Sequence, residues 1–143
     1  MVIDHIGIVV RSIKEGVERW GELFGYEQRT SVVVNTRQSV RVVFLEKQGS
    51  QTVKLIEPLG PASPVWLFSR RGGGLHHVCF RCDRLETGIA HLKQHGARLL
   101  VEPAPGEAFN NHEIAFLLVE PALNVELIDT VEKVWSTAPV RDE

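Results

Sequence analysis

The sequence predicts an α+β fold in which two tandem βαβββ repeats form a curved mixed sheet around one cavity. The main observation is an internal repeat: HIGIVVRSIKEGV, residues 5–17, aligns without a gap on HVCFRCDRLETGI, residues 77–89, at an offset of 72 positions. Two further pairs of segments match at this offset, VRVVFL with HEIAFL (40–45 and 112–117) and VKLIE with VELID (53–57 and 125–129). One register shared by three blocks in the same order indicates two copies of one module.

The elements of each copy follow from hydrophobic periodicity. A strand opens each copy (residues 2–10 and 75–82). A helix follows, with apolar residues at helical spacing: Ile13, Val17, Trp20 and Leu23 in the first copy, and Leu85, Ile89 and Leu92 in the second. Gly25 and Gly96 stand where helix C-caps are expected. Three strands complete each copy, near residues 27–34, 39–47 and 51–57 and near residues 97–101, 112–119 and 123–130.

The 143 residues are predicted to form a single domain, because this length supports one hydrophobic core and is short for two. Its parts are repeat one (2–58), a linker helix (63–71), repeat two (75–130) and a polar tail (131–143). We expect Ser63 to cap the linker helix, Pro64 to occupy its first turn, and the glycines at 72–74 to lead into the next strand.

The composition argues against several classes of partner. The formal net charge is −2 with both signs mixed, so the chain lacks a basic stripe for nucleic acid or an anionic membrane. No segment reaches the roughly 20 apolar residues of a spanning helix, and Met1 leads straight into a strand, which predicts a cytoplasmic protein. Cys79 and Cys82 lie on a strand, where residues three apart face opposite sides, which favours two separate reduced thiols. We expect a homodimer that acts on a small molecule.

Strand alternation predicts which polar residues share the cavity. His5 and His77 occupy equivalent positions on the first strands of the repeats, and Lys54 and Glu126 occupy equivalent positions on the last strands. If the repeat symmetry is kept in space, these four side chains converge as a ring. Glu57 and Asp129 then face the other way, and so does His76, the alternative to His77.

Two imidazoles and one carboxylate form a ligand set for a catalytic divalent cation that leaves positions open for water or substrate. A lone strand histidine is more often a hydrogen-bonded core residue. Two histidines at equivalent positions, with Glu126 on the ring, favour the metal site formed by His5, His77 and Glu126. The residue types do not distinguish Mn, Co, Ni, Fe and Zn.

Four motifs, DHIGIVV, GLHHVCF, IAFL and NVELID, resemble the vicinal-oxygen-chelate superfamily of glyoxalases, bleomycin-resistance proteins and extradiol dioxygenases. The resemblance covers residues 2–130 and is greatest to the methylmalonyl-CoA epimerase branch. It implies four metal ligands, at the positions of His5, Lys54, His77 and Glu126. Lys54 departs from the pattern, because an ammonium has no lone pair for a metal. Arg37, in TRQSVRV, stands where the branch places its glutamate base.

Three functions follow from the resemblance. The first is a metal-dependent isomerase, epimerase or lyase acting on a small anionic carbonyl or acyl-thioester compound, with Lys54, Glu107 and Arg37 as catalytic candidates. In it, Arg70, Arg71 and His112 are candidates for binding the substrate, with Arg70 and Arg71 able to contact an anionic group such as a coenzyme A phosphate. The second is a three-ligand enzyme like the dioxygenases or resistance proteins. The third is a metal-free binding protein with a Lys54–Glu126 ion pair.

Overall fold

The computed structural model describes residues 1–134 of the chain. Its strands are β1 (Val2–Val9), β2 (Glu27–Gln28), β3 (Val33–Asn35), β4 (Val40–Glu46), β5 (Val53–Pro58), β6 (Gly74–Arg81), β7 (Arg98–Pro105), β8 (Glu113–Val119) and β9 (Leu123–Ile128). Its helices are α1 (Ile13–Phe24), α2 (Trp66–Arg70) and α3 (Leu85–Gln94), and η1 (Glu107–Phe109) is a short 3-10 turn. None of the helices in the described part is long and apolar enough to cross a membrane.

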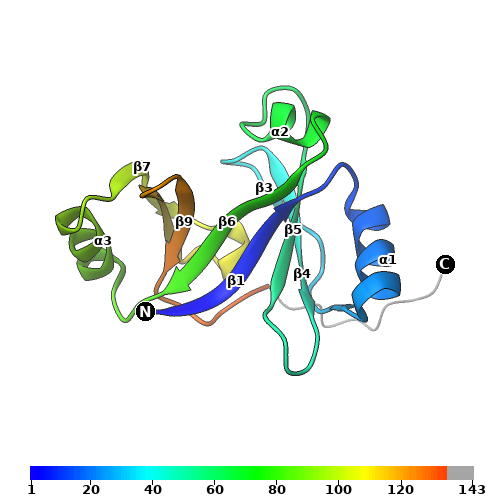
Figure 1. The fold of residues 1–143 in the computed structure, drawn as a ribbon, viewed down its shortest axis with the longest axis horizontal. Coiled ribbons are helices and arrows are strands. Elements are labelled where there is room, and N and C mark those ends of the chain that lie inside the picture. Colours follow the sequence, from blue (N-terminus) through cyan, green and yellow to red (C-terminus); the bar gives the residue numbers. More distant parts are fainter. Residues whose placement is uncertain (135–143) are drawn as a thin grey trace.

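The strands within residues 1–134 form one mixed sheet in the order β2-β4-β5-β1-β6-β9-β8-β7, with β3 also paired to β4. The two repeats meet at the antiparallel pair β1–β6 in the middle of the sheet. The parallel pairs, β1–β5 and β6–β9, lie on either side of it. Helices α1 and α3 lie at opposite ends of the molecule (Figure 1). The predicted fold class is therefore confirmed.

Residues that are equivalent at the offset of 72 also pair in the same way between strands and bind the first turns of the helices in the same way. Ile6 pairs with Val53 in the first repeat, and the equivalent residues Val78 and Val125 pair in the second. Glu57 accepts a hydrogen bond from the first backbone N–H of α1, and Asp129, its equivalent, accepts one from the first N–H of α3. Both carboxylates thus face the helix side of the sheet, as alternation predicted, where they satisfy helix N-termini.

Three apolar clusters form the core. One packs α1 on β4 and β5, and a second packs α3 on β8 and β9. Gly16 and Gly88 allow each helix to lie close to the sheet, because a Cβ at either position would come within 3.0 Å of an equivalent leucine, Leu55 or Leu127. The third cluster lies between the two repeats and includes Phe44 and Phe109. This cluster surrounds the predicted ring.

Several predicted boundaries were wrong. The strand expected at 27–34 is split into β2 and β3, because the Thr30 hydroxyl, in place of a backbone carbonyl, accepts the N–H of Phe44. The linker helix begins only at Trp66, because Ser63 accepts the N–H of Val65 before the first helical turn. In the expected tail, buried Lys133 pairs with Asp4 of β1, and the N–H of Val134 donates to the carbonyl of Ala108 in η1. Residues 135–143 lie outside the described part.

Candidate metal centre

The four ring residues come together in the interior, on the four central strands of the sheet. His5 lies on β1, Lys54 on β5, His77 on β6 and Glu126 on β9, and all four side chains are at most 3% exposed. They meet because the two repeats pair through β1 and β6 and each repeat adds its last strand alongside in parallel. The symmetry expected from the sequence is therefore kept in space.

The ligand atoms of the predicted triad converge on one point. His77 Nε2 lies 2.8 Å and His5 Nε2 lies 3.1 Å from Glu126 Oε2, and the two nitrogens are 3.4 Å apart. Two ligands bound to a metal at about 2.1 Å and at right angles are about 3 Å from each other. The spacing therefore fits a facial set of two histidines and one carboxylate around a divalent cation.

The hydrogen bonding of His5 gives a second test of this fit. His5 Nδ1 lies 2.7 Å from Asp4 Oδ2, which as a carboxylate can only accept. Nδ1 must therefore carry a proton, and in the neutral imidazole the lone pair of Nε2 then points at Glu126. Two electron-rich atoms 3.1 Å apart need a proton or a metal cation between them. The donor set of this chain thus suits a metal ion.

Lys54 adds a positive charge beside the triad. Its Nζ lies 3.3 Å from Oε2 and 3.4 Å from Oε1 of Glu126, which is the ion pair considered from the sequence. Burial alone would raise the pKa of Glu126, but the charge of Lys54, together with the neighbouring His5 and His77, outweighs burial and holds this pKa well below its usual value. Glu126 is therefore ionised, and a metal ion would share it with the ammonium.

His77 is held in its neutral, ligand-competent form. Burial lowers the pKa of its imidazole to about 4, although Glu126 acts in the opposite direction. The ring lies over Gly7, its cross-strand partner on β1, and a Cβ at Gly7 would come 2.2 Å from a ring carbon. Gly7 thus provides the space that the ligand histidine occupies.

Gly7→Ala is expected to displace the His77 ring and weaken metal binding by at least tenfold, because misorienting a metal ligand has effects of roughly that order. Isothermal titration of the metal-free protein with Zn²⁺ measures the effect. Gly49→Ala is the control, since a Cβ there meets nothing within 4 Å, although its positive φ adds local strain. Unchanged affinity in Gly7→Ala would show that His77 does not need this position.

A cavity of about 250 Å³ opens beside the triad. Lys54 and His77 reach it from the ring, and most of the remaining wall is apolar, including Val42, Ile56 and Phe116. Gln38, His76 and Asn124 add polar groups to the wall. The cavity therefore combines a buried ligand set with a small, mainly apolar chamber, which is the usual composition of a small-molecule site.

His76 does not face away from the cavity as expected. Its ring lines the cavity, and its Nδ1 lies 2.8 Å from Nδ1 of His77. It is not a member of either candidate ligand group in the described residues, so the choice of His77 as the ring residue agrees with the geometry. The orientation that simple strand alternation predicts for His76 is therefore wrong, because the β1–β6 ladder shifts its register at this residue.

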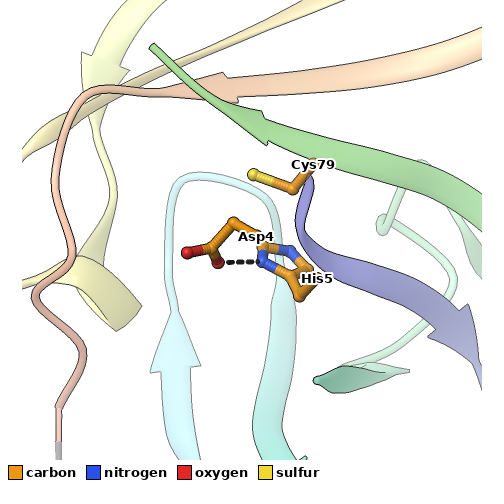
Figure 2. A group of neighbouring side chains, drawn as sticks. All are labelled: Asp4, His5 and Cys79. Carbon is orange, nitrogen blue, oxygen red and sulfur yellow. Dashed lines mark hydrogen bonds and ion pairs between the residues drawn. The ribbon is translucent and has the colours of Figure 1, made fainter. Parts of the chain in front are cut away.

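A second cluster, Asp4 with His5 and Cys79, is shown in Figure 2. The carboxylate of Asp4 is already paired with Arg81 and Lys133, at 3.4 and 3.2 Å. Burial raises the pKa of the Cys79 thiol well above its usual value, so this thiol stays protonated and is a poor ligand. We therefore interpret Asp4 as a partner of His5. Cys79 and Cys82 are free thiols, as the strand pattern predicted.

Glu107 and Arg37, two of the catalytic candidates, do not line the cavity. Glu107 accepts hydrogen bonds from the backbone N–H and the hydroxyl of Thr36, both at 2.7 Å. The Thr36 hydroxyl bond lowers the pKa of Glu107, which makes it a weaker base. Arg37 is exposed on the same turn. Of the three catalytic candidates, only Lys54 reaches the cavity.

The three substrate-binding candidates also lie outside the cavity wall. Arg70 is exposed and its guanidinium lies over the ring of Trp66, 5.5 Å from the centroid. Arg71 is exposed as well, and His112 pairs with Glu132 at 3.4 Å on the surface. Any contact of these side chains with a ligand would involve a part that extends beyond the cavity.

Four polar residues at the site were not assigned to it from the sequence: Asp4, Gln38, His76 and Asn124. A signal for two of them was present, because Asp4 and His76 are equivalent at the offset of 72 and each precedes a ring histidine. Gln38 and Asn124 carried no such signal, since their places in the wall depend on how the turn before β4 and the start of β9 face the chamber.

Comparison with known proteins gives a consistent result. The family model of the Glyoxalase/Bleomycin resistance protein/Dioxygenase superfamily matches residues 4–116. The uncharacterized protein YqjC of Bacillus subtilis is 36% identical over 116 residues, which cover 80% of this chain and 81% of that protein. Mitochondrial methylmalonyl-CoA epimerase of Mus musculus is 29% identical over 104 residues, 71% of this chain but only 57% of the mouse protein.

A solved structure extends the similarity over nearly the whole chain. It is a single-residue variant of Streptomyces coelicolor methylmalonyl-CoA epimerase in complex with 2-nitronate-propionyl-CoA. Its TM-score to this structure is 0.75 at 28% sequence identity, and the match covers 90% of this chain and 96% of that one.

Proposed function

The chain belongs to the glyoxalase/bleomycin resistance protein/dioxygenase superfamily, and on this basis we propose that it is a divalent-metal-dependent isomerase or lyase resembling methylmalonyl-CoA epimerase. Its substrate would be a small anionic carbonyl or acyl-thioester compound. The observation that carries the proposal is the convergence of His5, His77 and Glu126 within 3.4 Å of one another beside a small cavity.

His5, His77 and Glu126 would hold the metal ion, which in such a site supplies Lewis-acid stabilisation of an enolate-type oxygen. The chain's own groups bind and orient the substrate. Lys54, which forms an ion pair with Glu126, donates hydrogen bonds to a carboxylate or enolate oxygen that enters the cavity. The apolar wall around it excludes water, which strengthens these electrostatic contacts.

The size of the cavity limits the reacting part of the substrate. A chamber of about 250 Å³ holds a small acyl group, and a coenzyme A carrier would extend outside it. The complex of the Streptomyces coelicolor relative with 2-nitronate-propionyl-CoA supports an acyl-thioester of this kind. The cytoplasmic location and the homodimer stay predictions from the sequence.

Two other functions are supported by specific observations. The facial arrangement of two histidines and one glutamate is also that of non-haem iron oxygenases, so a three-ligand enzyme is the second candidate. The Lys54–Glu126 pair favours a third, a metal-free protein that binds a small molecule, because the buried ammonium partly satisfies the charge that a metal would neutralise.

The proposal is tested by measuring the metal content of the untagged protein by plasma mass spectrometry and by titrating the metal-free form with Mn, Fe, Co, Ni and Zn. We expect roughly one equivalent of metal per chain, as in other mononuclear sites, and loss of binding in His5→Ala. His91→Ala is the matched control, because His91 is an exposed helix histidine whose ring contacts that of His95, away from the candidate metal centre.

The metal-loaded protein is then incubated with methylmalonyl-CoA in deuterated water. Exchange of the α-proton, measured by mass spectrometry, is expected in the unmodified protein and in His91→Ala but not in His5→Ala. Binding of metal without exchange would support the oxygenase candidate if oxygen is consumed with the Fe²⁺-loaded form. If none of the five ions binds stoichiometrically, the enzyme proposal is contradicted, and the metal-free binding protein becomes the favoured function.

A further inference from the structure

The two ligand histidines have symmetry-related neighbours that contact them in the same way. Asp4 precedes His5 and His76 precedes His77, and the two positions are equivalent at the repeat offset. Asp4 Oδ2 lies 2.7 Å from Nδ1 of His5, and His76 Nδ1 lies 2.8 Å from Nδ1 of His77. Each neighbour therefore contacts the ring nitrogen opposite the one that faces Glu126.

Neighbouring side chains on a regular strand point to opposite faces, so these contacts need a local change in the backbone. The β1–β6 ladder provides one in both repeats. It passes from the pair Ile3–Phe80 to His5–Cys79, omitting Asp4, and from Gly7–His77 to Ile8–Leu75, omitting His76. Asp4 and His76 are thus the extra residues of two β-bulges, which turn each side chain toward the adjacent ligand.

Asp4 and His76 differ in the hydrogen bonds that they can form with the adjacent ligand histidine. Asp4 is a carboxylate fixed by Arg81 and Lys133, so it can only accept, and it holds the proton of His5 on Nδ1. His76 is an imidazole that can either donate or accept at Nδ1. Its other nitrogen, Nε2, has no hydrogen-bond partner among the described residues, and its ring lines the cavity. His76 can therefore transmit a change at His77 to a ligand in the cavity.

We infer that metal binding at His77 reverses the tautomer of His76 and turns its Nε2 from a hydrogen-bond acceptor into a donor toward the cavity. Without metal, His77 Nε2–H donates to Glu126, 2.8 Å away, and His77 Nδ1 accepts from His76 Nδ1–H. If His77 Nε2 held a metal ion, it could no longer carry its proton, which would instead lie on Nδ1 and be donated to His76 Nδ1. The proton of His76 then lies on Nε2, and the two rings together keep both protons.

This inference rests on the metal site of the proposed function and refines its substrate class. In the metal-bound form, Lys54 and His76 are both hydrogen-bond donors in the cavity wall, beside the cation. Such a set suits a ligand that presents two or more oxygen acceptors, such as a carboxylate next to a developing enolate oxygen. In the metal-free form the acceptor at His76 Nε2 disfavours the same ligand.

The tautomers are read by two-bond proton–nitrogen correlation NMR of the uniformly 15N-labelled protein, near neutral pH, with Zn²⁺ as a diamagnetic probe. His76 is assigned by the signals missing in His76→Phe, which keeps a ring but removes both nitrogens. We expect the proton on Nδ1 of His76 before zinc is added and on Nε2 afterwards. The exposed His91 and His95 serve as internal controls whose tautomers do not depend on a metal at the centre.

Zinc affinity gives a second readout that does not depend on activity. His76→Phe is expected to bind zinc roughly 10-fold to 100-fold more weakly, the usual effect of losing an outer hydrogen-bond partner. His76→Gln is expected to recover part of this loss, because its amide oxygen can accept from His77 Nδ1–H. Zinc binding with an unchanged His76 tautomer would overturn the inference alone, whereas absence of zinc binding would overturn the inference and the proposed enzyme together.

Discussion

Lys54→Gln is expected to tighten binding of a divalent metal by about a hundredfold, which corresponds to about 2.7 kcal/mol. Two unit charges about 4 Å apart interact by about 4 kcal/mol at an effective dielectric constant near 20, and a divalent ion doubles the repulsion from an ammonium. Lys54 Nζ lies 3.3 Å from the oxygen on which the triad converges, so most of this repulsion acts on the metal. We expect the Lys54 side chain to move away from a bound metal, so the gain in binding free energy on removing its charge is only about 2.7 kcal/mol.

Calorimetric titration of the metal-free forms with Mn²⁺ or Zn²⁺ measures this change. Glutamine also supplies a carbonyl oxygen that can bind a metal, so Lys54→Met separates loss of charge from gain of a ligand. Lys47→Gln is the control, because it removes the same charge from an exposed lysine that donates to the Phe24 carbonyl. If Lys54→Gln and Lys54→Met bind metal no better than the unmodified protein, the ammonium does not oppose the metal.

Glu126→Ala is expected to abolish stoichiometric metal binding and to destabilise the fold by about 3–5 kcal/mol, the usual effect of removing one partner of a buried ion pair. Glu126 has no exposed surface, and its Oε2 contacts His5, His77 and Lys54. Its loss leaves a buried ammonium without its carboxylate and removes one of three metal ligands. Urea unfolding of the metal-free protein measures the loss of stability.

The double variant Glu126→Leu with Lys54→Met separates the two effects. It replaces both charges with apolar side chains of similar size, so we expect most of the stability to return while metal binding stays absent. Glu113→Ala, at an exposed position on β8, is the control for loss of a glutamate. Equal stability of Glu126→Ala and the unmodified protein would mean that Lys54 reaches solvent once its partner is removed.

The sequence alone determined the two-repeat architecture and the members of the ring. Both follow from two periodicities that can be read along the chain, the alternation along a strand and the fixed offset of 72 between copies. These periodicities are kept in the fold because each repeat buries the same face. The equivalent caps at Glu57 and Asp129 were placed on the helix side for the same reason.

Only the tertiary structure decided what surrounds the ring. The bulges that turn Asp4 and His76 toward the ligand histidines arise from how β1 and β6 pair, and alternation along one strand cannot reveal an extra residue in a ladder. The positions of Glu107 and Arg37 likewise depend on a turn that is closed by the hydrogen bonds of Thr36. Cross-strand pairing and turn closure are contacts between distant residues, so they decide which polar groups reach the cavity once the periodic pattern has built the sheet.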